Sequence, residues 1–201
     1  PAVKAVGVEF FGLENFEIDA GNASNAIELG GFMKRSRLFD LKVKNFQENG
    51  LLGKGLAGVS RDFVVLENIE FKPNGSSANG MTFTNGTAPS GRVRIQGCRF
   101  IGPNNQGIHM EVGVNFFEIR ECIFDRSNVG IQLGKGPLTW RNIIFTNNTF
   151  YQGKIGIAFG NMPTTQTSDL ALHRNLFAGL SGPELVIQAE FDDKKFDRAI
   201  S

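Results

Sequence analysis

The sequence contains few of the residues that usually build catalytic, metal or disulfide sites. Its 201 residues include two Cys, two His, one Trp and one Tyr. Two cysteines cannot form the framework of a disulfide-rich secreted domain. The sequence also lacks the cysteine and histidine spacing of a metal site, a glycine-rich phosphate loop and a nucleophile elbow. We therefore expect no metal ion and no cofactor.

Excess charge and long apolar runs are absent as well. The chain has 21 Lys and Arg against 20 Asp and Glu, a formal net charge of +1, and its basic residues do not cluster. A nucleic-acid partner is therefore not expected. No apolar run approaches the roughly 18 residues of a membrane span. The chain opens on Pro1 without a recognisable signal peptide, so we expect a mature product or part of a longer protein.

Phenylalanine and glycine are the abundant residues. The 19 Phe have no polar tip, which favours a dry interior over a surface that stacks on sugars. Four of the 25 Gly follow Asn, and Asn-Gly pairs are turn signals because both residues tolerate positive φ. The pairs that we interpret as turns are Asn49-Gly50, Asn74-Gly75, Asn79-Gly80 and Asn85-Gly86.

An eight-residue pattern recurs seven times, at steps of 24 to 29 residues. It covers residues 11–18, 39–46, 64–71, 93–100, 117–124, 143–150 and 170–177. Each unit has two apolar-alternating triplets around a dipeptide in which Asn or Gly often comes second, so it predicts strand, tight corner, strand. The predicted inward columns are Ile18, Phe46, Phe71, Phe100, Phe124, Phe150, Phe177 and Leu13, Leu41, Leu66, Ile95, Ile119, Phe145, Leu172.

A third alternating segment follows each unit after a variable loop. The segments are 26–29, 50–53, 80–83, 107–110, 130–133, 156–159 and 184–187, of which 50–53 is the least regular. Three short strands per turn of about 26 residues bury their inner faces by stacking turn upon turn. The sequence therefore predicts an all-β, right-handed parallel β-helix of about seven coils, formed by one domain over residues 1–188. A leucine-rich repeat has a similar period, but it needs one strand and a helical return per repeat.

These repeats resemble the right-handed β-helix repeats of the pectate-lyase-like superfamily, over roughly residues 8–188. The resemblance implies that the outer face of the third-strand sheet forms the substrate groove. Its predicted outward residues are Glu28, Thr82, Thr84, His109, Glu111, Gln132 and Ala158. His109 and Glu111 are two residues apart on one strand and could form a catalytic pair with His109 as general base. Thr82, Thr84 and Gln132 are candidate ligands for sugar hydroxyls, and the alternative is a solvated surface.

The acidic constellations of the superfamily's enzymes are largely missing. Its polygalacturonases carry an adjacent Asp-Asp pair, which occurs here as Asp192-Asp193 beyond the last repeat, and its lyases cluster carboxylates around calcium. On the predicted groove, Glu28 and Glu111 lie about three coils apart. We therefore favour an extracellular, cell-surface or periplasmic module that binds carbohydrate or has a structural role. The alternative is a polysaccharide lyase or glycoside hydrolase.

Other polar residues of the repeats have structural explanations. Cys98 and Cys122 share an inward column, which favours free thiols over a disulfide. Asn148 and Asn175 share that column and need hydrogen-bond partners, which they could provide for each other. Lys44 falls in the same column, where an unpaired ammonium is costly, and this suggests a register slip in that coil. The outward charges of the first strands, such as Arg94 and Glu118, alternate in sign between coils, as cross-strand ion pairs do.

The two ends of the predicted solenoid have no evident cap. Residues 189–201 are charged and form either a short cap or the start of a further coil. We expect the chain to be part of a longer protein and to contact further coils of that protein end to end. A polysaccharide is the other expected partner.

Overall fold

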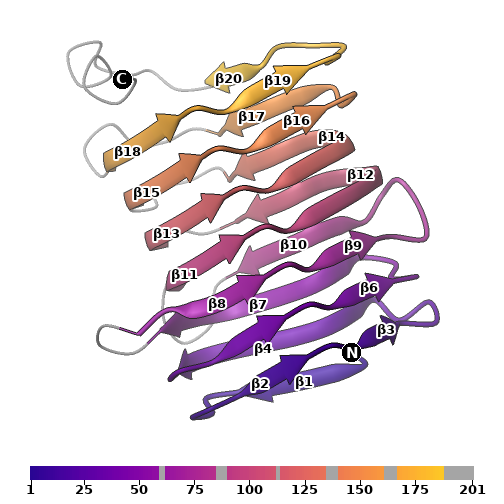
Figure 1. Cartoon of the computed structure of the whole chain (residues 1–201), viewed down its shortest axis with the longest axis vertical. Helices are drawn as coiled ribbons and strands as arrows, with labels where there is room; N and C mark the ends of the chain where they lie inside the picture. Colours follow the sequence, from indigo (N-terminus) through magenta and orange to yellow (C-terminus); the bar gives the residue numbers. More distant parts are fainter. Residues whose placement is uncertain (59–61, 85–89, 112–113, 135–139, 161–166, 188–201) are drawn as a thin grey trace.

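The protein is an all-β parallel solenoid. The computed structural model describes residues 1–58, 62–84, 90–111, 114–134, 140–160 and 167–187. These segments form twenty strands, paired in parallel, and contain no helix, which excludes the leucine-rich repeat. The strands stack in about six turns, close to the predicted seven coils. In Figure 1 the front strands run to the right, the rear strands run to the left and the chain rises, so the winding is right-handed.

Each coil supplies three strand positions, as predicted. The first strands are β2 (Gly12–Glu14), β5 (Arg37–Phe39), β8 (Val64–Glu67), β11 (Ser90–Gln96), β13 (Val114–Arg120), β15 (Trp140–Thr146) and β18 (Thr167–His173). The second strands include β3 (Glu17–Asp19), β6 (Lys42–Lys44), β9 (Glu70–Lys72), β16 (Thr149–Tyr151) and β19 (Leu176–Ala178). The third strands include β1 (Val3–Val6), β4 (Asn25–Met33), β7 (Asn49–Gly58), β10 (Asn79–Thr84), β17 (Ile155–Phe159) and β20 (Leu185–Ile187). Two long strands, β12 (Arg99–Met110) and β14 (Ile123–Leu133), occupy both the second and the third position.

The predicted phenylalanine column forms the centre of the core from the third coil onward. Its members pair in register and are Phe71, Phe100, Phe124, Phe150 and Phe177. Successive rings are nearly parallel, with centroids 4.8–5.3 Å apart, the spacing of neighbouring strands. The register of the sheet thus sets the ring geometry.

The second coil departs from the predicted register by three residues. Leu38 pairs with Leu13 and Leu66, and Val43 pairs with Ile18 and Phe71. Leu41 and Phe46, which we placed in those columns, are instead buried at corners. The expected one-residue slip was therefore wrong in size.

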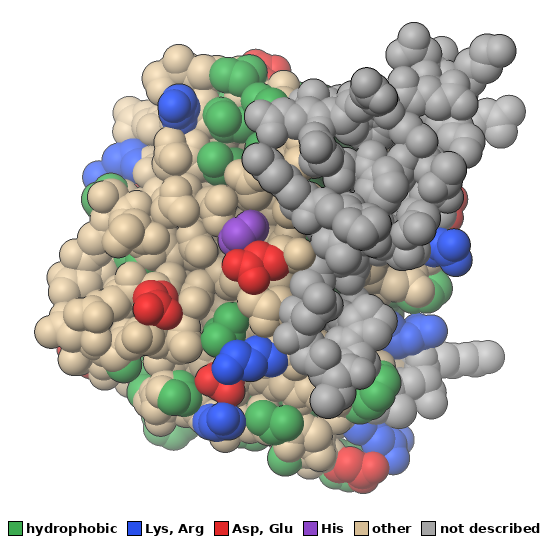
Figure 2. All heavy atoms as spheres, turned by 180° about the vertical axis from the view of Figure 1, so that it is seen from behind, with side chains coloured by type: hydrophobic (Ala, Val, Ile, Leu, Met, Phe, Trp, Pro, Cys, Tyr) green, Lys and Arg blue, Asp and Glu red, His purple; other side chains and the backbone are tan. Residues whose placement is uncertain are grey.

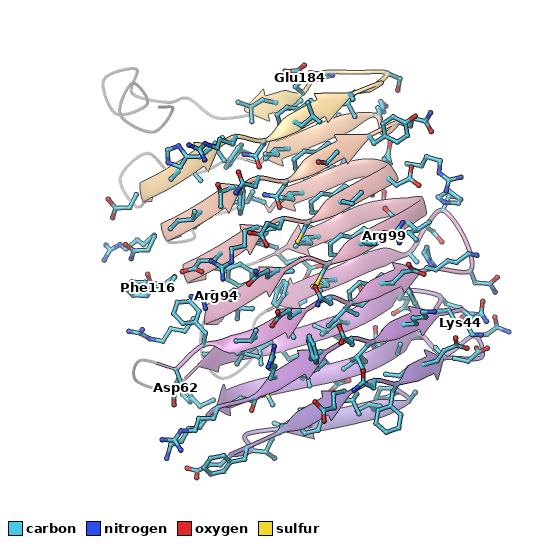
Figure 3. The ribbon with its side chains drawn as sticks, in the orientation of Figure 1. Lys44, Asp62, Arg94, Arg99, Phe116 and Glu184 are labelled. Atoms are coloured by element: carbon cyan, nitrogen blue, oxygen red, sulfur yellow. The ribbon has the colours of Figure 1, made fainter. Side chains whose placement is uncertain are left out.

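The positions of Val43 and Lys44 explain why the chain adopts this register. The corner between first and second strands takes positive φ in every coil, at Asn15, Asp40, Asn68, Gly97, Glu121, Asn147 and Arg174. The predicted register would place the β-branched Val43 there, whereas the observed one places Asp40, which tolerates that conformation better. It also turns Lys44 outward (Figure 3), where its Nζ lies 2.5 Å from Glu17 Oε1 and 3.6 Å from Asp19 Oδ2.

A glycine column at the start of the third strands accommodates the phenylalanine column. A Cβ on Gly50, Gly80, Gly107, Gly130 or Gly156 would lie 2.3–2.4 Å from a ring carbon of the phenylalanine in the next coil. The first coil has Ala26 at this position, and the next coil has Val43 in place of phenylalanine. Our interpretation of Asn49-Gly50 and Asn79-Gly80 as turns was wrong, since both pairs lie in strands. These glycines provide space for a ring.

Asn148 and Asn175 form the predicted hydrogen-bonded pair at the corner between first and second strands. Asn148 is fully buried; its Nδ2 donates to Asn175 Oδ1 and to Ile119 O, and its Oδ1 accepts from the Cys122 N–H. Asn175 Nδ2 in turn donates to the carbonyl of Phe145. Every polar atom of the buried Asn148 carboxamide therefore has a partner, as burial demands.

The structure describes the N-terminal end of the solenoid but not the C-terminal tail. At the N-terminal end, Phe10, Phe16 and Phe32 are each more than half exposed. The tail that we interpreted as a cap or further coil, with its Asp192-Asp193 pair, lies outside the described residues. Within the described segments, no helix has the length and apolar character needed to span a membrane.

Candidate functional site

The outward side of the third strands carries the predicted site residues; we call it the third-strand face (Figure 2). Strand pairing aligns one residue per coil in a single outward row. The row is Lys4, Glu28, Leu52, Thr82, His109, Gln132, Ala158 and Val186. Thr84 follows two residues after Thr82 on β10, and Glu111 comes directly after the end of β12, two residues beyond His109. The structure therefore brings together the outward residues that we expected, around His109.

His109 and Glu111 form the central pair of this face, with 3.7 Å between His109 Nδ1 and Glu111 Oε1. The His109 side chain is 21% exposed and that of Glu111 is 49% exposed. Burial lowers the pKa of His109, and the nearby Glu111 carboxylate partly opposes that shift. The imidazole is consequently neutral at neutral pH, with one nitrogen that donates and one that accepts a hydrogen bond.

A chain of amide and hydroxyl groups extends from this pair toward the N-terminal coils. Thr82 Oγ1 donates to Asn49 Oδ1 at 2.5 Å and accepts from Asn79 Nδ2 at 3.1 Å. Asn49 Nδ2 donates to Asn25 Oδ1, and Asn105 Nδ2 contacts Asn79 Oδ1 at 3.4 Å. Because Thr82 is 3% exposed and already bonded, it orients the asparagine amides.

Gln106 and Gln132 continue the polar surface toward the C-terminal coils. Gln106 Nε2 donates to Gln132 Oε1 at 3.3 Å, and both side chains are half-buried. Sequence analysis identified Gln132 but missed Gln106, Asn25, Asn49 and Asn79. The missed asparagines precede Gly or Ala at the start of a third strand, which is the signal that could have identified them.

Glu28 is held by two lysines. Its Oε1 lies 3.0 Å from Lys4 Nζ and 3.4 Å from Lys54 Nζ, and the side chain is 9% exposed. The hydrogen bond from Lys4 is the largest cause that lowers the pKa of Glu28; burial opposes it and Lys54 reinforces it. Glu28 is therefore an ionised structural carboxylate, and it stands three coils from Glu111, as predicted.

The remaining sequence candidates have structural roles. Cys98 and Cys122 are both buried and free, as expected, and burial raises the pKa of the Cys122 thiol, with Cys98 adding to the shift. A buried thiol of raised pKa is a poor nucleophile. Among the described residues, no three His, Cys, Asp or Glu side chains come together as a metal site requires.

The outer face of the first strands carries the expected cross-strand pairs. Arg94 (labelled in Figure 3) has its Nε 2.6 Å from Glu118 Oε2, and its guanidinium lies over the Phe63 ring. In the second coil the corrected register pairs Arg37 with Val65, and the Arg37 guanidinium reaches Glu67, two residues along the neighbouring strand, again at 2.6 Å. Such exposed pairs contribute little individually, so this face is a solvated surface.

Comparisons with protein-family models, with curated proteins and with solved structures find no match to this chain. The resemblance to the pectate-lyase-like superfamily thus stays a prediction from the repeats. The parallel β-solenoid itself follows from the strand pairing alone.

Proposed function

We propose that the protein is an extracellular β-solenoid module that binds a carbohydrate polymer on its third-strand face. The observation that carries this proposal is the polar surface around His109, where amides, hydroxyls and a neutral imidazole line up over successive coils. Amides and a neutral imidazole offer both donors and acceptors, as sugar hydroxyls require. A polymer of this kind lies outside the cell, which is the basis for the proposed location.

The spacing of the coils supports an extended ligand. Neighbouring coils repeat at about 4.8 Å along the axis, so the outward side chains of Thr82, His109 and Gln132 form a flat, elongated row. A flat row binds a chain through many contacts along its length, in contrast to a pocket that encloses one small molecule. The proposal that the chain is one module of a longer protein is supported by the exposed side chains of Phe10, Phe16 and Phe32, because further coils would cover them.

The alternative is a polysaccharide lyase or glycoside hydrolase that uses the same face. The neutral His109 beside Glu111 favours a lyase, in which the imidazole removes a proton from the sugar. Hydrolysis by the common mechanism needs two carboxyl groups about 5–9.5 Å apart. On the described part of this face Glu28 is bound by Lys4 and Lys54, so a partner for Glu111 is missing, and we favour binding without turnover.

Binding and turnover can be measured on the same polymers. Soluble neutral and acidic polysaccharides are tested for retardation of the protein in affinity electrophoresis and for release of unsaturated or reducing ends. We expect retardation that weakens in Gln132→Ala and His109→Ala, with no product. Arg37→Ala, on the first-strand face, is the control and should bind like the wild type. Product that disappears in His109→Ala would establish the lyase instead, and no retardation by any polymer would refute binding.

A further inference from the structure

The four Asn-Gly pairs of the sequence lie in different surroundings. Asn49-Gly50 and Asn79-Gly80 lie in strands, and Asn85-Gly86 lies outside the described residues. Asn74-Gly75 lies in the loop between β9 and β10, which projects from the right-hand edge of the solenoid in Figure 1. Both residues of this pair are exposed.

An asparagine followed by glycine can react with its own backbone. The nitrogen of the following residue attacks the side-chain carboxamide, and glycine hinders this attack least because it has no Cβ and leaves the chain free to rotate. The reaction requires a nitrogen that is not hydrogen-bonded and a backbone that can bring the two groups together. Asparagine is a thermolabile residue for such reasons.

The surroundings of Gly75 meet these requirements. In the part of the chain that the structure describes, the Gly75 N–H has no hydrogen-bond acceptor. A Cβ built on Gly75 would have no heavy atom within 4 Å, so nothing crowds the attacking nitrogen. The Asn74 carboxamide is held by one bond, in which its Nδ2 donates to Asn22 Oδ1 at 2.7 Å. That bond is exposed, so water competes for it and the carboxamide stays free to turn.

The two pairs in strands do not meet these requirements. Asn49 and Asn79 are opposite each other in strands that pair on both sides, and both carboxamides are hydrogen-bonded within the third-strand face. Gly50 and Gly80 are buried against phenylalanine rings of the following coils. Attack at either pair therefore requires the sheet to open first.

We propose that Asn74 is a site of spontaneous deamidation. The Gly75 nitrogen bonds to Asn74 Cγ and gives up its proton, and the Cγ–Nδ2 bond breaks so that Nδ2 leaves as ammonia. Water then opens the resulting five-membered succinimide at either carbonyl and yields an aspartyl or isoaspartyl residue. Water is the only reagent, and nothing is oxidised or reduced.

The product changes a contact between two loops. A carboxylate at position 74 has no N–H to donate, so Asn22 Oδ1 loses its partner and faces a negative charge. The loop of the first coil and the loop of the third coil are then no longer joined through these side chains. This inference is independent of the proposed carbohydrate function.

Peptide mass spectrometry measures deamidation at each asparagine separately. The purified wild-type chain is incubated at mildly alkaline pH, sampled over time and digested, both folded and unfolded in urea. In the folded protein we expect Asn74 to react at least about tenfold faster than Asn49 and Asn79, because their strands must open first. In urea the three should react at similar rates. Similar rates at all three in the folded protein, or no conversion of Asn74, would overturn the proposal.

Gly75→Ala tests the identity of the attacking nitrogen. The added Cβ meets open space and Gly75 does not have positive φ, so the fold should be retained. The methyl group should slow conversion of Asn74 by about tenfold, because it hinders the attack. Gly12→Ala is the matched control, since a Cβ there also meets open space, and it should leave the rate unchanged. An unchanged rate in Gly75→Ala would contradict attack by the Gly75 nitrogen.

Discussion

Gly107 lies directly against the ring of Phe124, the inward residue of the following coil. A Cβ on Gly107 would come within 2.4 Å of Phe124 Cδ1 and 2.6 Å of the carbonyl oxygen of Gly130. Real Cβ atoms do not approach other heavy atoms so closely, so the stacked rings fit because this position has no side chain. The relationship repeats along the solenoid and leads to the first prediction.

Gly107→Ala should lower the free energy of unfolding by about 1–3 kcal/mol, the usual cost of overpacking a core. Denaturant unfolding followed by circular dichroism measures the change. Ala26→Gly is the matched control, with an expected loss of roughly 0.5–1 kcal/mol from chain entropy. Adding Phe124→Val to Gly107→Ala reproduces the Ala26–Val43 arrangement, so the double variant should be more stable than the sum of the two single losses predicts. Strict additivity would show that Gly107 and Phe124 do not interact in this way.

Asn148→Leu should destabilise the protein by roughly 2–4 kcal/mol. Leucine fills a similar volume but leaves the Cys122 N–H and the Ile119 carbonyl buried without partners, each at about 1–3 kcal/mol. Urea unfolding measures the loss, with Thr149→Ala on the outward side of the next strand as control. An unchanged midpoint for Asn148→Leu would mean that the asparagine pair contributes no stability.

Acid should lower the free energy of unfolding because burial of His109 disfavours protonation of its imidazole. The unfolded imidazole titrates near pH 6.5, and burial lowers the pKa in the folded protein. Below about pH 6.5 the unfolded chain therefore binds more protons than the folded one, so stability falls as the pH drops toward the folded pKa and levels off below it. His109→Gln should flatten this part of the stability profile, as measured by unfolding midpoints between pH 4.5 and 8.

Glu111→Gln should lower the pKa of His109 further, because it removes the carboxylate that raises this pKa. NMR titration of the imidazole should show a pKa lower than in the wild type. A pKa that rises or stays constant would mean that Glu111 does not face His109 in solution.

The two cysteines should be unreactive in the folded protein. Cys98 and Cys122 are fully buried, and the raised pKa of Cys122 leaves little thiolate at neutral pH. A colorimetric thiol reagent should label both residues on unfolding and at least tenfold more slowly before it. Rapid labelling of the native chain, or a mass that indicates a disulfide, would contradict this expectation.

The repeats predicted most of the fold because inward residues recur with period two in seven units. The second coil was the exception, since Leu38, Leu41, Val43 and Phe46 are all apolar and two registers bury them equally well. The residue at the corner between first and second strands decides between the registers. That corner takes positive φ, and Asp40 tolerates this conformation better than Val43. Apolar periodicity alone cannot show it.

The candidate site was predictable only in part. Alternation along the third strands identified Glu28, His109, Glu111 and Gln132 as outward, and the strand pairing places Glu28, His109 and Gln132 in one row. Hydrogen bonds between residues about 25–35 positions apart, such as Thr82 to Asn49, depend on the rotation of side chains across coils.

The pairing of each glycine with the next coil's phenylalanine also bears on how such a chain can change length. Duplication of one repeat between Gly50 and Phe177 would preserve every glycine–phenylalanine match, so the rod could grow or shrink by whole coils without repacking. A copy inserted before Val43 would instead place Ala26 against a ring. The first two coils are thus matched to each other through Ala26 and Val43, whereas the later coils are interchangeable units.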